Sequence, residues 1–89
     1  MTLGTGKVHI PPAHAMLEAG EAETAVLLSA IARRIGELSA GQVLEVASRG
    51  ADAQMDAVEW CQESGHELVA LLADGPVTRF WIRKRISTE

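Results

Sequence analysis

One apolar stripe in residues 24–39 places the strongest constraint on how this chain can fold. Its members are separated by one, three or four residues, as side chains on one side of an α-helix are: Leu27, Leu28, Ile31, Ile35 and Leu38. Thr24 is the expected N-cap of this helix, and Gly41 is its expected C-terminal stop. A helix that is apolar on one side must cover that side with another element.

Four apolar segments predict strands that could supply this cover, at residues 14–18, 42–48, 66–73 and 77–84. The dipeptide Asp74-Gly75 predicts a hairpin between the last two, and Pro76 stiffens its turn. A second helix is expected over residues 52–64, capped by Asp52 and ended by Gly65. Its apolar side is expected to carry Met55, Val58 and Cys61, with Ala57 and Trp60 beside them.

This order of segments predicts an α+β fold, a two-layer α/β sandwich of order βαβαββ. Both helices would pack on one face of a four-stranded mixed sheet and share one core. The length of 89 residues allows one domain, and a hydrophobic content of 47% is enough for its core. Residues 1–12 contain Pro11 and Pro12 and are expected to form an irregular N-terminal extension, with the domain spanning residues 13–89.

The charged residues are unevenly distributed along the chain. The formal net charge is −4, yet four of the eight Lys and Arg residues lie near the C-terminus, at Arg79, Arg83, Lys84 and Arg85. These four are candidate partner-binding residues, because a basic patch on an acidic body suits a protein partner as well as RNA. A solvated strand end is the alternative explanation. The overall acidity argues against a nucleic-acid partner.

Cys61 is the single cysteine, so neither an intramolecular disulfide nor a four-cysteine zinc site can form. His66 follows it by five residues with a helix end between them, which is a poor pair of metal ligands. We therefore expect no metal and no cofactor. No apolar run approaches the roughly 18 residues of a membrane span, and the N-terminus lacks the apolar core of a signal peptide. A cytoplasmic location without a membrane partner is expected.

Three segments carry a recognisable pattern. Residues 40–46 read Ala-Gly-Gln-Val-Leu-Glu-Val, residues 60–68 read Trp-Cys-Gln-Glu-Ser-Gly-His-Glu-Leu, and residues 80–84 read Phe-Trp-Ile-Arg-Lys. In this order and spacing, from about Leu17 to Lys84, the chain resembles the TusA/SirA family of small sulfur-carrier proteins. The resemblance also matches Asp56 to an acidic residue at the start of the family's second helix. It implies the same two-layer fold and a place in sulfur transfer.

The chain departs from that family at the residue that matters most. The resemblance implies a first helix opened by Cys-Pro-x-Pro, whose cysteine carries the sulfur, and counting back from Gly41 places this cysteine on Thr24. The residues there read Thr-Ala-Val-Leu, so both prolines are also replaced. Glu21 replaces the glycine before the motif, and Gly50-Ala51 replaces an Asp-Pro after the second strand.

A persulfide carrier needs a thiolate at neutral pH, and the start of a helix stabilises one through unpaired amides and the helix dipole. A hydroxyl cannot hold a transferable sulfur. A dipole effect of about 0.3–1 kcal/mol is also far too small to ionise an alcohol. We therefore assign no catalytic residue, and Thr24 is a degenerate site position. Cys61 is the only thiol, and we expect it to be buried and inert.

Three hypotheses follow from the sequence. The first is a non-catalytic protein-binding module of sulfur trafficking, with a sulfur-relay protein as the candidate partner. The second is a sulfurtransferase or sulfur carrier that acts through Cys61 or through a cysteine of a partner, which the exposure of Cys61 would test. The third is a weak nucleic-acid-binding regulator, which needs the basic residues on one face. Arg79 and Arg83 alternate together along the strand, whereas Lys84 points the other way. The oligomeric state stays open.

Overall fold

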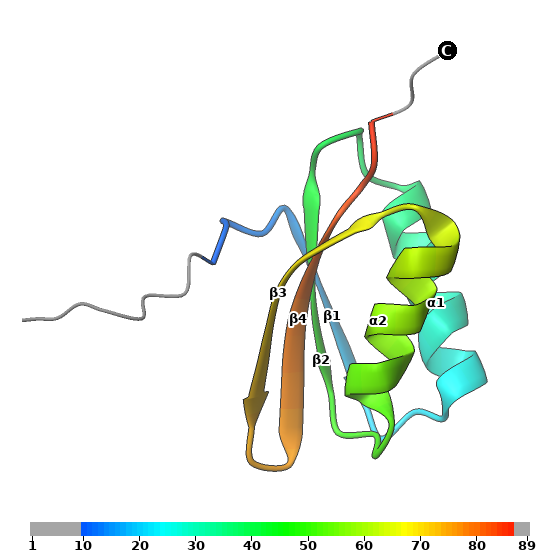
Figure 1. Cartoon of the computed structure of the whole chain (residues 1–89), viewed down its shortest axis with the longest axis vertical. Coiled ribbons are helices and arrows are strands. Elements are labelled where there is room, and N and C mark those ends of the chain that lie inside the picture. The colour runs from blue at the N-terminus through cyan, green and yellow to red at the C-terminus, as the bar shows by residue number, and fades with distance from the viewer. Residues whose placement is uncertain (1–9, 87–89) are drawn as a thin grey trace, which may run out of the picture.

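The computed structural model describes residues 10–86 (Figure 1). Its elements, in chain order, are β1 (Ala15–Gly20), α1 (Thr24–Gly36), β2 (Val43–Ser48), α2 (Ala53–Ser64), β3 (Glu67–Asp74) and β4 (Val77–Arg83). This is the predicted order βαβαββ. Of the irregular extension expected at residues 1–12, residues 1–9 lie outside the described residues. Residues 10–13 form neither helix nor strand.

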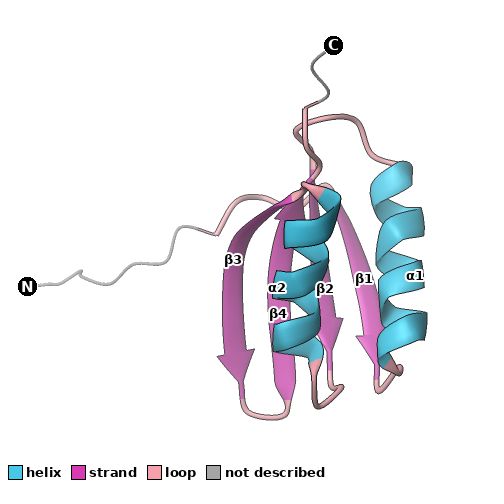
Figure 2. Ribbon diagram, turned by 45° about the vertical axis from the view of Figure 1, so that its right-hand side comes forward, coloured by secondary structure: helices cyan, strands magenta, loops and turns pink. Residues whose placement is uncertain are grey.

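The four strands form one mixed sheet in the spatial order β1-β2-β4-β3. β1 pairs with β2 in parallel, and β4 pairs with both β2 and β3 in antiparallel fashion. Both helices cover the same face of the sheet, and no helix formed by residues 10–86 lies on the other face, which we call the helix-free face (Figure 2). The predicted α+β two-layer sandwich is therefore confirmed.

The core lies between the helices and the covered face of the sheet. The apolar stripe of α1 forms the helix side of this core, as expected, with Leu27, Ile31 and Ile35 at most 2% exposed. Strands β2 and β4 supply the opposing layer: Leu44, Val46, Phe80 and Ile82. The stripe residues are four apart and therefore lie on one side of α1, and the strand residues are two apart and therefore lie on one face of the sheet. These two apolar surfaces pack against each other in one central core.

The buried side of α2 differs from the prediction. Ala53, Ala57 and Cys61, spaced four apart, face the core, whereas Met55 is 63% and Val58 is 36% exposed. At 3.6 residues per turn, Met55 lies on the side of the helix away from Ala57. Small side chains therefore make the helix–sheet contact, and the larger apolar side chains of this helix lie outside the core.

The ends of α1 also correct the prediction. Glu23, not Thr24, occupies the N-cap and makes no side-chain capping bond, and Thr24 is the first helical residue. The helix ends at Gly36, before the expected residue 39, because Glu37 donates its backbone N–H to the carbonyl of Arg34 in a tightened last turn. Gly41 is therefore not the stop, and it adopts a φ of 86° in the turn before β2.

The ends of α2 follow the prediction more closely. Asp52 occupies the N-cap, although its side chain makes no capping hydrogen bond. Gly65 ends the helix in the left-handed conformation and donates its N–H to the carbonyl of Cys61. Strand β1 begins and ends slightly later than the predicted residues 14–18, and the hairpin after Asp74 is confirmed by its pairing with Val77.

Candidate functional site

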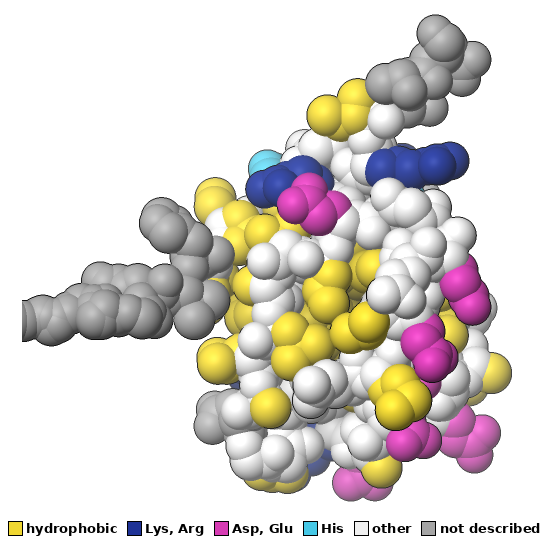
Figure 3. Space-filling view, in the orientation of Figure 1, with side chains coloured by type: hydrophobic (Ala, Val, Ile, Leu, Met, Phe, Trp, Pro, Cys, Tyr) yellow, Lys and Arg dark blue, Asp and Glu magenta, His cyan; other side chains and the backbone are white. Residues whose placement is uncertain are grey.

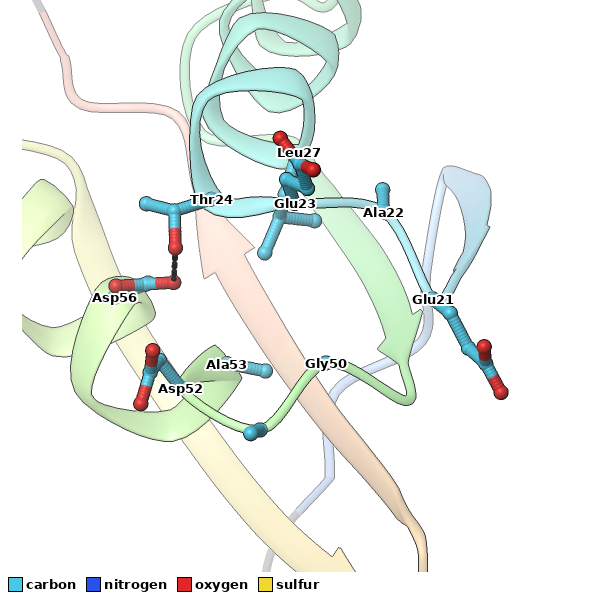
Figure 4. Close-up of a pocket in the computed structure, with 10 residues that line it drawn as sticks. Glu21, Ala22, Glu23, Thr24, Leu27, Gly50, Asp52, Ala53 and Asp56 are labelled. Atoms are coloured by element: carbon cyan, nitrogen blue, oxygen red, sulfur yellow. Dashed lines mark hydrogen bonds between the residues drawn. The ribbon is translucent and has the colours of Figure 1, made fainter.

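The starts of the two helices lie side by side and form a pocket. Because β1 and β2 are parallel, both strands end at the same edge of the sheet, and each is followed by a helix that begins there. A pocket of about 310 Å³ opens between these helix starts (Figure 4). Its lining comes from both connections and both first turns: Glu21, Ala22, Glu23, Thr24, Leu27, Gly50, Ala51, Asp52, Ala53 and Asp56.

Thr24 and Asp56 join the two helix starts. The hydroxyl of Thr24 donates a hydrogen bond of 2.7 Å to the carboxylate Oδ2 of Asp56, and Figure 4 shows the two side chains pointing toward each other. A carboxylate is much too weak a base to ionise an alcohol, so this contact does not make Thr24 a nucleophile. The bond positions a polar pair at the point where the first residue of α1 meets the first turn of α2.

The pocket is acidic. Glu21, Glu23, Asp52 and Asp56 all contribute to its lining, although Figure 4 shows Glu21 pointing away from Thr24. The helix starts carry partial positive charge, which stabilises carboxylates placed beside them. Neither N-cap side chain makes a capping bond, so unpaired amide donors remain at both helix starts. The four carboxylates nevertheless make the side-chain charge of this lining negative, which suits the cationic groups of a partner better than it suits an anion.

Cys61 lies elsewhere, in the core. Its side chain is 6% exposed and packs with the buried residues of both layers, as the sequence predicted. Burial raises the pKa of its thiol from 9.0 to about 11. Cys61 does not line the pocket at Thr24, so the structure does not bring the only thiol to the helix starts.

The four basic candidates fall into two pairs. Arg79 and Arg83 lie on the helix-free face of the sheet, where they form ion pairs with Glu45 at 3.4 Å and Glu67 at 2.9 Å. Lys84 and Arg85 line a second pocket, at the end of the molecule where the helices finish. In Figure 3, basic side chains lie toward the upper end of the face shown, and acidic ones lie mostly along the α2 side and toward the lower end.

Within residues 10–86, no three side chains of His, Cys, Asp or Glu lie close enough together to hold a metal ion. None of the helices formed by these residues has the length and apolar character needed to cross a membrane.

Comparison with known proteins identifies the family. A family sequence model described as "Sulfurtransferase TusA" matches residues 28–84, well over half of the chain. The chain belongs to the TusA family. The match begins after Thr24, so position 24 itself lies outside the TusA alignment. A curated protein of Bacillus subtilis (strain 168), named "Putative sulfur carrier protein YrkI", is 35% identical over 52 residues, which cover 58% of this chain and 69% of that protein.

The contact between Thr24 and Asp56 was not predicted from the sequence of this TusA-family chain. Asp56 was noted only for its match to an acidic family residue, and 32 residues separate it from Thr24. A signal was nevertheless present, because a strand–helix–strand–helix order with parallel strands places both helix starts at one sheet edge. The sequence also did not predict that Lys84 and Arg85 line the same pocket as Ser64 and His66, because this depends on where the chain leaves β4.

Proposed function

We propose that this TusA-family chain is a protein-binding module of sulfur trafficking that carries no sulfur on its own side chains. The observation that carries this proposal is that neither Thr24 nor Cys61 offers an accessible thiol at the start of α1. Thr24 stands at the helix start where the family resemblance places the carrier cysteine, and its hydroxyl is bound to Asp56. The only thiol, Cys61, is in the core.

Carriage of sulfur through Cys61 is disfavoured by its chemistry. A persulfide forms when a thiolate attacks the donor sulfur. With a pKa of about 11, about one in ten thousand of the Cys61 thiols is ionised at neutral pH. The side chain is also 6% exposed, so a donor protein cannot reach its sulfur without opening α2. A single buried thiol is compatible with the reducing cytoplasm, where we propose that the protein acts.

The proposed docking surface surrounds Thr24, and we call it the helix-start surface. It comprises the acidic pocket and two exposed apolar side chains beside it, Met55 and Val58. The hollow at Met55 and Val58 shares Ala51 and Asp52 with the acidic pocket. Exposed apolar side chains rimmed by carboxylates fit a partner with an apolar centre and a rim of Lys and Arg.

A sulfur-relay protein is the partner that the family membership supports. The binding of nucleic acid is less well supported, because Arg79 and Arg83 are neutralised by Glu45 and Glu67 and do not share a surface with Lys84. The chain would then act by docking to a relay protein at the surface that a sulfur-carrying relative would use, without accepting the sulfur.

Intact-mass spectrometry tests the chemical half of this proposal. The wild-type protein is incubated with a cysteine desulfurase and L-cysteine, and so are Cys61→Ala and the double variant Thr24→Cys/Cys61→Ala. We expect no added sulfur on the first two proteins and one added sulfur on the double variant. A sulfur atom added to wild type and absent from Cys61→Ala would refute the proposal and favour carriage through Cys61.

Isothermal titration with the same cysteine desulfurase tests the docking half. We expect wild type to bind and Met55→Ser to bind more weakly, because Met55 is a large exposed side chain of the helix-start surface. Leu72→Ser is the matched control, since Leu72 is 40% exposed on β3, away from that surface. Equal weakening by both substitutions, or no binding by wild type, would count against the assigned surface.

A further inference from the structure

A second pocket lies at the end of the molecule opposite the helix-start surface, and the proposed function does not use it. It has a volume of about 640 Å³ and is lined by Leu38, Ser39, Ala40, Ser64, His66, Lys84 and Arg85. Every polar side chain in this lining can donate a hydrogen bond, and none is a carboxylate. The chain has 12 acidic and 8 basic residues and is negatively charged overall, whereas the lining of this pocket carries only positive charges.

The donors of this pocket are held in place by their neighbours. The ammonium Nζ of Lys84 donates to the carbonyl of Leu38 at 2.6 Å, which leaves further N–H donors on the same group. The backbone N–H of Arg85 donates to Nδ1 of His66 at 3.0 Å. The neutral ring of His66 therefore carries its proton on Nε2. Trp60 stacks on this ring with a centroid separation of 5.3 Å and fixes its orientation.

The charge balance at this pocket is positive. Within residues 10–86, the ion pairs involve Arg34, Arg79 and Arg83 but neither Lys84 nor Arg85. Both helices end beside the pocket, and each helix end contributes roughly half a negative charge. Two full positive charges outweigh these two partial ones. Their effect reaches His66, whose pKa is lowered by burial and then by the charges of Arg85 and Lys84.

We propose that this pocket binds a phosphate group. The lining residues that carry an ammonium, a guanidinium, an imidazole and two hydroxyls come from three separate segments of the chain. A tetrahedral oxyanion has acceptor oxygens in enough directions to meet donors from all three, whereas a planar carboxylate does not. These donors gather at one pocket and do not form a stripe along the surface, so the ligand is a single phosphate group and not a nucleic-acid backbone.

Backbone amide shifts measured by two-dimensional NMR test this proposal on the full chain. Inorganic phosphate and O-phosphoserine are titrated separately at constant ionic strength, with acetate as the carboxylate comparison. We expect saturable shifts at Ser39, Ser64, His66 and Arg85 with phosphate and little response to acetate. A response to inorganic phosphate alone assigns a free anion, and a response to O-phosphoserine assigns a phosphorylated molecule. Equal responses to phosphate and acetate, or no saturable shift with either phosphate ligand, would overturn the proposal.

Charge-matched variants separate a site from general attraction. Lys84→Gln/Arg85→Gln and Arg33→Gln/Arg49→Gln each remove two positive charges, and Arg33 and Arg49 are exposed residues outside the pocket. We expect the first pair to weaken phosphate binding about tenfold or more and the second to leave it nearly unchanged. Arg85→Gln alone changes only an exposed side chain, so it gives the same test if loss of Lys84 impairs folding. Equal weakening by both double variants would refute a site at this pocket.

Discussion

The hydroxyl of Thr24 is bound to the carboxylate of Asp56, so a thiol placed there would meet the same negative charge. In a Thr24→Cys/Cys61→Ala protein, the start of α1 lowers the pKa of the introduced thiol, and Asp56 raises it by disfavouring a second negative charge. We expect the further substitution Asp56→Asn to lower that pKa by about one unit. The pH dependence of alkylation by iodoacetamide measures it.

Glu63→Gln is the charge-matched control for this experiment, because Glu63 is exposed on the same helix but does not line the pocket. The expected fall in pKa belongs to Asp56→Asn alone. If Glu63→Gln lowers the pKa of the introduced thiol by as much, the Thr24–Asp56 contact does not control the chemistry of position 24.

The reactivity of Cys61 should follow from its burial. Because its side chain is 6% exposed and its thiol has a pKa of about 11, we expect a thiol reagent to label the folded protein very slowly. Labelling should become fast once denaturant unfolds the chain. Stopped-flow measurement with a coloured disulfide reagent makes the comparison, and rapid labelling without denaturant would contradict the structural role of this thiol.

The same thiol predicts how stability depends on pH. Below pH 9.0 both the folded and the unfolded states keep the Cys61 proton, so its contribution does not vary there. Between pH 9.0 and about 11 the unfolded state loses the proton first, so the free energy of unfolding falls as the pH rises. The fall should reach about 2–3 kcal/mol. Urea unfolding across this range checks it, and Cys61→Ala should lack this part of the fall.

Among the elements, α2 ends at a residue whose backbone conformation favours glycine. Gly65 has a φ of 86°, and a Cβ added there would lie 3.1 Å from Nη1 of Arg85. We expect Gly65→Ala to lower the free energy of unfolding by about 1 kcal/mol or more. Gly36→Ala in α1 is the matched control, because a Cβ at Gly36 meets nothing within 4 Å and its φ is not positive. Chemical denaturation measures the free energy of unfolding of both variants, and the loss should be clearly larger for Gly65→Ala than for Gly36→Ala.

The elements also show how far the sequence alone could lead. The stripe of α1 and the Asp74-Gly75 turn are local patterns, and both predicted their elements correctly. The face of α2 was predicted wrongly because Met55 and Val58 are the more apolar residues, whereas the sheet accepts the small side chains of Ala53 and Ala57. Hydrophobicity alone does not report how much space the facing layer leaves.

The position of Thr24 in the fold was predictable from the sequence, whereas its surroundings were not. Counting along the family pattern identified Thr24, which does stand at the start of α1. Its neighbour Asp56 and the pocket at Lys84 depend on contacts between distant segments, which no local spacing encodes. The place of a residue within a helix can thus be predicted from the local sequence. The side chains that surround it are known only from the packed structure.

For the whole molecule, the separation of charge predicts weak binding to nucleic acid. The net charge is −4, and two of the four C-terminal basic candidates are held in ion pairs on the helix-free face. We expect short RNA and DNA to bind poorly, if at all, at physiological salt. Fluorescence anisotropy with labelled oligonucleotides measures this. Submicromolar binding that weakens steeply with added salt would show that Arg79, Arg83, Lys84 and Arg85 act together after all.

The position of β4 has a consequence for synthesis. Among the elements of residues 10–86 this strand is the last in chain order, yet it lies between β2 and β3, and Phe80 and Ile82 complete the core. While β4 is still inside the ribosome, β2 lacks its antiparallel neighbour and β3 has none, so the two helices cannot cover a finished sheet. The domain therefore folds only after β4 has emerged, and a nascent chain stalled before Val77 would expose its apolar residues to chaperones and proteases.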